Sequence, residues 1–366
     1  MFTPQRLTLA RERRGLTKRK LSELVGITER SIISYESGEQ DPSPETLSRL
    51  ARALSFPEGF FGAAETFVPS VETVSFRSLA RMTAQRRNAA IGASAIAIML
   101  NSWIEQNFDL PPVNVPDLRG HEPEVAADML RKTWGMDLNP AQNMVHLMEA
   151  NGIRVYSLAD QTADADALSF WNDDVPFISL NTMKSGERGR FDAAHELGHI
   201  VLHRHGGPIG QDAEKEAHAF AAAFLMPKAS ILSTAPQWPT LEHILIHKKF
   251  WSVSAFAYVV RLKNLNLITE WQYINLCKEL SKKGYRSEEK DGIQREVSQL
   301  LAKVFSALRE DGISKAHVAY ELNINIDELA SHIFGLVLTS VAGGGNAPLS
   351  STVRDQLTLL QGGKPN

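Results

Sequence analysis

The sequence contains a single cysteine, Cys277, in 366 residues. A lone thiol cannot form a disulfide within the chain, which excludes a disulfide-stapled scaffold and favours a reducing compartment. The first residues lack the apolar core of a secretory signal, because Arg6 and Arg11 interrupt them. The most apolar stretch, residues 89–104, is shorter than the ~20 residues that span a bilayer and contains Asn101. We therefore expect a cytoplasmic protein without a membrane partner.

The remaining composition is that of an ordinary globular protein. Hydrophobic residues make up 43% and charged residues 22% of the chain, so neither wholesale disorder nor a coiled-coil rod fits. At ~150 residues per domain, the length predicts two or three folding units. The net charge is −3, but residues 1–35 hold eight Lys or Arg against three Glu. Basic charge is therefore concentrated at one end of the chain.

Short helices separated by glycine and by capping residues are expected in about the first sixty residues. Gly15, Gly26 and Gly38 stand where helices end, and Thr17 and Thr28 stand where the next helices begin. A threonine at such a position accepts a hydrogen bond from a free N–H of the first turn, and glycine closes a helix in the left-handed conformation. The expected core of this unit is aliphatic and comprises Leu24, Ile27, Ile32 and Leu50.

The hydrophobic period changes in the middle of the chain. Residues 152–156, 167–171 and 176–180 are short, rich in aromatic and β-branched side chains, and separated by Asp, Asn and Gly. They predict a small antiparallel sheet between helical regions, so the expected fold class is mainly α with one α+β unit. The segment from Val341 onward is rich in Gly, Pro and Ser and is expected to be a mobile tail.

The strongest chemical signal is the run His195-Glu196-Leu-Gly-His199. On an α-helix, residues four apart lie ~6 Å apart along the axis and ~40° apart around it, so both imidazoles can bind one zinc ion at ~2.0 Å. Glu196 flanks the same site and is expected to act as the general base toward a water that the metal activates. A chance match to so short a pattern is the alternative, and a catalytic zinc still needs a third protein ligand.

Glu214 and Glu216 are the candidates for the third metal ligand, whereas His203 is excluded by distance. His203 lies ~12 Å along an unbroken helix from His195, so no single ion binds both. The Ala-rich segment 212–227 is expected to be a helix packed against the motif. Glu214 shares its small apolar face, whereas Glu216 lies ~200° away around the helix. We therefore expect Glu214 to be the third ligand.

The surrounding blocks carry a resemblance to a known family. SFRSLARMT, PFISLN, RFDAAHELGHIVLH and EKEAHAFAAAFLMP occur in this order, and over roughly residues 76–230 the chain resembles the ImmA/IrrE family of zinc metallopeptidases. The resemblance implies a zincin-like fold, zinc bound by His195, His199 and Glu214, Glu196 as the base, and a repressor-type protein as the substrate. Manganese is the alternative metal. His218 departs from the family, which usually has Asn there.

The basic N-terminal unit carries a second resemblance. Over residues 3–57, LARERRGLTKRKLSELVGITERSIISYESGEQDPSPETLSRLARAL is similar to the lambda-repressor-like (XRE) helix-turn-helix domains. The resemblance implies that one helix crosses the DNA backbone and the next enters the major groove. Arg30 is the expected guanine reader, and Lys18 is expected to contact a phosphate. The full expected contact set is Lys18, Thr28, Glu29, Arg30, Ser31 and Ser34. A head that binds only protein is the alternative.

The expected domain organisation follows from these two resemblances. It comprises an XRE-type helix-turn-helix domain (1–62), a helical connector (63–118), an ImmA/IrrE-like zinc metallopeptidase domain (119–230) and a helical C-terminal region with the mobile tail (231–366). Residues 312–336 also have a helix-turn-helix rhythm but few positive charges, so we expect a packing or dimerisation element. The expected partners are an operator duplex and a second copy of the chain, because such heads commonly read two half-sites.

Two functions are compatible with this sequence. In the first, the protein is a transcriptional regulator with a zinc endopeptidase that cleaves a repressor-type protein or itself. An extended substrate would then add to the strand formed by Phe177, Ile178, Ser179 and Leu180, because edge pairing satisfies its backbone. In the second, the protein is a transcription factor whose metal-binding body is a non-catalytic sensor or stabilising domain.

Overall fold

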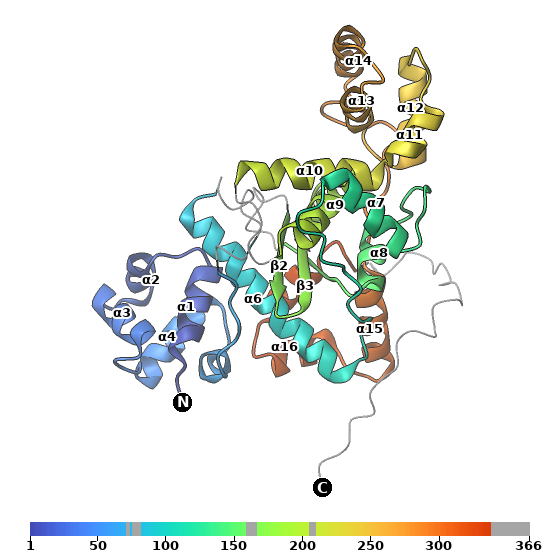
Figure 1. Cartoon of the computed structure of the whole chain (residues 1–366). Coiled ribbons are helices and arrows are strands. Elements are labelled where there is room, and N and C mark those ends of the chain that lie inside the picture. Colours follow the sequence, from blue (N-terminus) through green and yellow to red (C-terminus); the bar gives the residue numbers. More distant parts are fainter. Residues whose placement is uncertain (71–73, 75–81, 159–166, 205–209, 338–366) are drawn as a thin grey trace, which may run out of the picture.

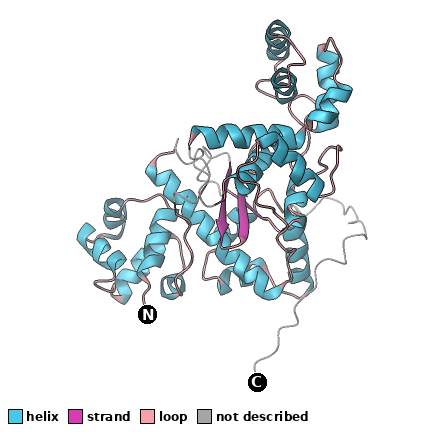
Figure 2. Ribbon diagram, in the orientation of Figure 1, coloured by secondary structure: helices cyan, strands magenta, loops and turns pink. Residues whose placement is uncertain are grey.

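The computed structural model describes residues 1–70, 74, 82–158, 167–204 and 210–337. Figure 1 shows a cluster of N-terminal helices, a central sheet with helices around it and a helical arm that projects from the centre. Helices dominate the regular structure (Figure 2), so the expected fold class, mainly α with one small sheet, is confirmed. The tail from Val341 and most of the block SFRSLARMT lie outside the described residues.

The N-terminal helices form a compact unit, which we call the head. It contains α1 (Pro4–Arg13), α2 (Lys18–Val25), α3 (Glu29–Ser37), α4 (Pro44–Leu54) and the 3-10 helix η1 (Glu58–Gly62). The Thr17 and Thr28 side chains cap α2 and α3 as predicted, and Gly26 closes α2 with a φ of 70°. Ile32 and Leu50 are fully buried as expected, but Leu24 is 54% exposed and does not belong to the core.

Helix α6 (Ala84–Asn107) contains the apolar stretch noted in the sequence and connects the head to the centre of the molecule. Gly92 faces α1, where a Cβ would lie 3.1 Å from the Cα of Arg13. Glycine therefore allows close approach of the two helix backbones. Figure 1 shows α6 running from the head past the sheet. Among the helices that the structure describes, none is long and apolar enough to cross a bilayer.

Strands β1 (Arg154–Ser157), β2 (Ala167–Asn172) and β3 (Val175–Leu180) form one sheet in the order β1-β3-β2. Strands β2 and β3 make an antiparallel hairpin, and Asp173 in its turn has a φ of 49°. Strand β1 pairs with β3 in the parallel direction, so the sheet is mixed rather than wholly antiparallel as expected. Side chains alternate between the two faces of the sheet in parallel and in antiparallel strands. The alternation of residues along one strand therefore does not show in which direction its neighbour runs.

The central position of β3 overturns the expected substrate strand. Phe177, Ile178, Ser179 and Leu180 pair with β1 on one side and with β2 on the other. Their backbone hydrogen-bonding groups are therefore occupied, and this strand cannot receive a substrate by edge addition. Within the described parts of the chain, no strand pairs with the outer edge of β2.

The remaining helices surround the sheet or extend away from it. Helices α7 (Pro123–Thr133), α8 (Met144–Ala150), α9 (Gly186–Leu202) and α10 (Gln211–Leu225) belong to the centre. The projecting arm in Figure 1 contains α11 (Lys228–Thr234), α12 (Leu241–Trp251), α13 (Ala255–Asn264) and α14 (Glu270–Lys282). The chain then returns to the centre through α15 (Gln299–Glu310), α16 (Lys315–Glu321) and α17 (Ile326–Ile333). The helical C-terminal region is therefore present, and it splits into an arm and a returning segment.

Buried charges join the returning segment to the head. Glu328 of α17 accepts from Arg13 Nε and from Arg14 Nη1, both at 2.6 Å, and its side chain is 2% exposed. His332, one turn further along α17, is also buried, and its Nε2 lies 3.3 Å from Glu328. We call these four residues the Glu328 cluster. Because it joins residues more than 300 positions apart, it ties the head to the C-terminal end of the fold.

Candidate metal centre and DNA-binding face

Helix α9 carries the two histidines of the motif on one face. The Ser185 side chain caps the helix by accepting a hydrogen bond from the backbone N–H of Arg188. Apolar residues of α9 pack beneath the sheet, and the Trp171 indole of β2 donates to the carbonyl of Ile200 at 3.3 Å. The spacing of four residues brings the Nε2 atoms of His195 and His199 to 3.2 Å from each other, as the helical geometry requires.

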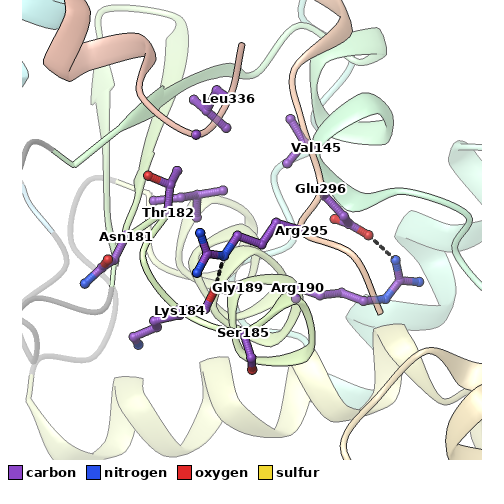
Figure 3. Close-up of a pocket in the computed structure, with 13 residues that line it drawn as sticks. Val145, Asn181, Thr182, Lys184, Ser185, Gly189, Arg190, Arg295, Glu296 and Leu336 are labelled. Atoms are coloured by element: carbon purple, nitrogen blue, oxygen red, sulfur yellow. Dashed lines mark hydrogen bonds and ion pairs between the residues drawn. The ribbon is translucent and has the colours of Figure 1, made fainter. Parts of the chain in front are cut away.

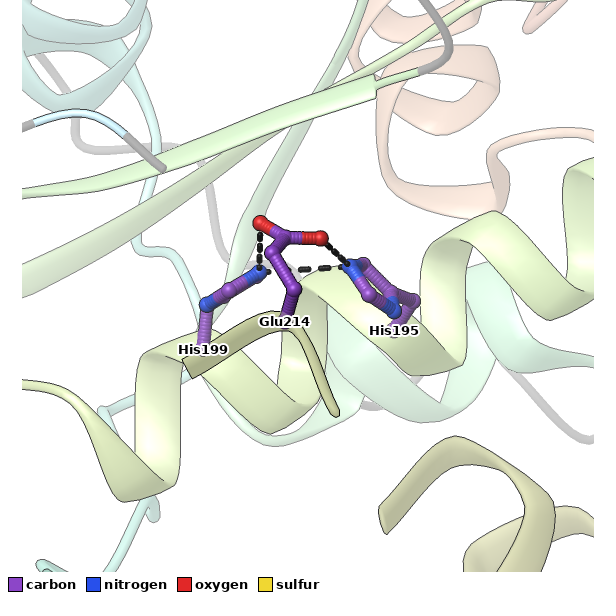
Figure 4. Close-up of side chains that lie close together, drawn as sticks. All are labelled: His195, His199 and Glu214. Carbon is purple, nitrogen blue, oxygen red and sulfur yellow. Dashed lines mark hydrogen bonds and ion pairs between the residues drawn. The ribbon is translucent and has the colours of Figure 1, made fainter. Parts of the chain in front are cut away.

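Helix α10 brings Glu214 to the same point. Its Oε2 lies 3.2 Å from His195 Nε2 and its Oε1 lies 3.3 Å from His199 Nε2 (Figure 4). Ligand atoms ~2.0 Å from one tetrahedral ion lie about 3.3 Å from one another, so this triangle has the dimensions of a zinc site. The three residues that the sequence proposed as ligands are therefore close enough to share one ion.

The electrostatics of this triangle favour a cation. Burial raises the pKa of Glu214, but the two histidines lower it more, so the pKa lies well below its ordinary value and the side chain is an anion. Burial lowers the pKa of His195, whereas Glu214 and Glu196 outweigh that effect and raise it. Carboxylates that attract a proton to His195 also attract a metal ion in its place.

Glu196 is buried beside the triangle and is held by a residue that the sequence did not indicate. Its side chain is 3% exposed, and its Oε2 accepts a hydrogen bond from Ser169 Oγ at 2.5 Å. Ser169 lies on β2, whose register against β3 places it opposite Ile178. No motif marks Ser169, because its contact with Glu196 exists only once β2 packs on α9.

A cavity opens beside the triangle between α9, α10 and α13. Its volume is 760 Å³, and Glu214, His218 and Phe191 lie in its wall together with apolar side chains of α13 such as Phe256 and Val260. This volume lies within the range of ligand pockets. The ring of His218 lies 4.8 Å from that of Phe191 and 6.2 Å from that of His195, so this departure from the family faces the cavity.

A second cavity lies at the start of α9 and is too small for a substrate. Its volume is 30 Å³, which is room for about one or two water molecules. In Figure 3, Arg295 points across it and donates from Nε to the carbonyl of Lys184 at 2.7 Å, and Arg190 pairs with Glu296. These contacts fix the segment before α15 to the start of α9.

A glycine on α9 allows α10 to bring Glu214 close enough. A Cβ on Gly198 would lie 3.1 Å from the Cα of Ala217 and from a ring carbon of Phe220. We expect Gly198→Val to lower the free energy of unfolding by about 1–3 kcal/mol and to weaken zinc binding, because α10 must move outward. Thermal melts with and without zinc measure both effects.

The matched control for that substitution is on the same helix. A Cβ on Gly189 meets nothing within 4 Å, so Gly189→Ala is expected to leave zinc binding unchanged and to stabilise the helix slightly. Equal zinc affinity in Gly198→Val and the wild type would show that the close helix contact does not position Glu214.

The predicted DNA-contacting residues lie around the start of α3. Thr28, Glu29 and Arg30 are exposed, and Ser31 and Ser34 are half-buried. The Thr28 hydroxyl accepts from the backbone N–H of Ser31, and Ser34 donates to Glu39 at 3.2 Å. The Lys18 ammonium, at the start of α2, lies 3.2 Å from Glu36. Ile33 is 45% exposed on α3 and is a further candidate that charge-based reasoning missed.

Comparisons with known proteins agree with both parts of this picture. A family model described as an IrrE N-terminal-like domain matches residues 148–263, which include α9 and α10, and one described as helix-turn-helix matches residues 7–61. An uncharacterized HTH-type transcriptional regulator of Methanothermobacter thermautotrophicus is 48% identical over 50 residues, which are 13% of this chain and 72% of that protein. The chain belongs to the XRE-type helix-turn-helix transcriptional regulators and carries a metallopeptidase-like domain of the IrrE/ImmA type.

Proposed function

We propose that this regulator hydrolyses a peptide bond at its metal centre, either in a repressor-type protein or in its own chain, and so controls transcription in the cytoplasm. The observation that carries the proposal is the convergence of His195, His199 and Glu214 beside the buried carboxylate of Glu196. Two imidazoles, a carboxylate ligand and a neighbouring base are the protein groups that hydrolytic zinc sites use.

The chain's own residues divide the catalytic work. Zinc or, as the alternative, manganese, bound by the three ligands, would polarise the scissile carbonyl and make water more acidic. The Glu196 carboxylate would accept the proton of the attacking water and deliver it to the leaving amine. Ser169 holds that carboxylate in one orientation through its hydrogen bond to Oε2. Preorganisation of this kind lets the base act without rearranging when the substrate arrives.

The substrate would approach along β2 rather than β3. The outer edge of β2 carries no paired strand among the described residues, and its Ser169 already touches Glu196. An extended peptide added there would satisfy its backbone by edge pairing. The cavity of 760 Å³ beside Glu214 is lined in part by apolar side chains and offers room for a large apolar side chain of that peptide.

Intact-mass measurement tests the proposed hydrolysis directly. The purified full-length chain is incubated with zinc or manganese, alone, with DNA duplexes, and with repressor-type helix-turn-helix proteins. New fragments that disappear when a chelator is added support the proposal. Metal binding without any fragment in all three conditions would instead favour a sensor or stabilising role for the metal-binding body.

The head is proposed to read an operator duplex as a homodimer. We expect Arg30→Ala to weaken binding by roughly 10- to 100-fold, because a bidentate arginine–guanine contact is lost. The measurement is fluorescence anisotropy on duplexes that the wild type selects from a random-sequence pool, with light scattering to determine the stoichiometry.

The matched control for DNA binding is Arg52→Ala. Arg52 is an exposed arginine of α4 that bonds a carbonyl of its own helix, outside the expected contact set. We expect it to bind like the wild type. Binding that is insensitive to salt in the wild type, or equal in Arg30→Ala and the control, would favour a head that binds protein.

A further inference from the structure

His203 and Glu216, which the sequence analysis excluded as metal ligands, lie beside the candidate ligand His199. His203 directly follows α9, and its Nδ1 lies 2.9 Å from the Nδ1 of His199. Its other ring nitrogen, Nε2, lies 3.0 Å from Oε2 of Glu216 on α10. The side chain of His203 is 8% exposed and that of Glu216 is 40% exposed. A continuous line of polar contacts therefore runs from a surface carboxylate to a candidate metal ligand.

The chemistry of these groups assigns a direction to each contact. An ionised carboxylate only accepts hydrogen bonds, so His203 donates from Nε2 to Glu216. A neutral imidazole carries one N–H, which leaves His203 Nδ1 as an acceptor. The proton between the two rings then belongs to His199 Nδ1, which donates to His203. His199 Nε2, the atom that faces His195 and Glu214, keeps its lone pair.

We propose that His203 and Glu216 are positioning residues that fix the tautomer and the ring orientation of His199 for metal binding. Metal-binding histidines commonly donate their second N–H to a carboxylate or a backbone carbonyl. Here an additional imidazole stands between the ligand and the carboxylate, and it links the end of α9 to α10. The inference rests on the proposed metal site but not on hydrolysis.

Zinc affinity of the full-length chain tests the proposal, measured by competition with a chromophoric chelator. We expect His203→Leu to weaken zinc binding by about 10- to 100-fold, because His199 loses its acceptor. His203→Asn is expected to restore most of the affinity, because its side-chain oxygen replaces the acceptor Nδ1. The visible absorption of the cobalt-substituted protein is expected to change in His203→Leu and to resemble the wild type in His203→Asn.

Two further variants separate positioning from folding. Glu216→Ala changes a half-exposed side chain and is expected to weaken zinc binding in the same direction but less. His317→Leu removes an exposed histidine that contacts Glu321 at 3.1 Å on α16, and it is the matched control with wild-type affinity expected. If His203→Leu were to fail to fold, the Glu216 variant would still report on the contact.

The results that would overturn the positioning role of His203 and Glu216 differ from those that would overturn the proposed peptide hydrolysis. Wild-type zinc affinity and cobalt absorption in His203→Leu would overturn the inference, as would an equal loss in His203→Asn and His203→Leu. A wild-type chain that binds neither metal would overturn it as well. Ordered zinc affinities without peptide hydrolysis would support the positioning role and reject the peptidase.

Discussion

Replacing Glu196 by glutamine is expected to lower peptide hydrolysis by about 10²- to 10⁴-fold while leaving zinc binding in place, because glutamine cannot accept the proton of the attacking water. The exchange conserves shape, and the amide oxygen can still accept the hydrogen bond from Ser169. The measurement combines zinc affinity with fragment formation by intact mass on the same sample.

The control for this prediction is an equivalent exchange far from the site. Glu279→Gln replaces an exposed glutamate of α14 and is expected to change neither quantity. Hydrolysis at the wild-type rate in Glu196→Gln would reject the assignment of this residue as the base. Loss of zinc together with hydrolysis would show that Glu196 supports the metal rather than the proton transfer.

Replacing Glu328 by glutamine is expected to lower the free energy of unfolding by about 3–5 kcal/mol, because the buried Arg13 and the partly buried Arg14 lose their counter-charge. Arg13 and Glu328 are 3% and 2% exposed, so water cannot replace the lost carboxylate. The Nη1 of Arg13 already has no hydrogen-bond partner among the residues that the structure describes. Urea unfolding at pH 7 measures the loss, and Glu310→Gln on α15, an exposed glutamate, is the control.

The same cluster predicts a dependence of stability on pH. Burial raises the pKa of Glu328, but His332, Arg13 and Arg14 outweigh it and hold the pKa well below its ordinary value. A carboxyl with a depressed folded-state pKa contributes stability above its unfolded value of about 4.3 and loses it as the pH falls below that. The difference between the wild type and Glu328→Gln is therefore expected to narrow below about pH 4. A constant difference down to pH 2 would contradict this explanation.

The candidate ligands could be predicted because they depend on local geometry. A spacing of four places His195 and His199 on one face of a helix whatever surrounds it. Glu214 was distinguishable from Glu216 because only one of them shares the small apolar face of α10. The helix ends in the head are equally local, since Thr17 and Thr28 act within their own first turns.

The remaining features depend on which elements meet, and local patterns do not encode this. The parallel pairing of β1 placed Phe177 and its neighbours inside the sheet, although their alternation suits an edge strand equally well. His203 was excluded as a ligand by its expected distance from His195, but its contact with Glu216 depends on the packing of α10 beside the end of α9. Ser169 lies 27 positions before Glu196 in the sequence. In the Glu328 cluster, Arg13 and Glu328 are more than 300 positions apart.

The amino-acid sequence by itself predicted the helical head and the three candidate metal ligands, because each follows from periodicities and caps within one or two helices. Only the tertiary structure decided which edge of the sheet is open among the described residues, which side chains contact Glu196 and His203, and how the head is attached to the C-terminal helices. These features arise from contacts between segments that are distant in the sequence. The free energy of each hydrogen bond or ion pair depends on its burial, which no short stretch of sequence specifies.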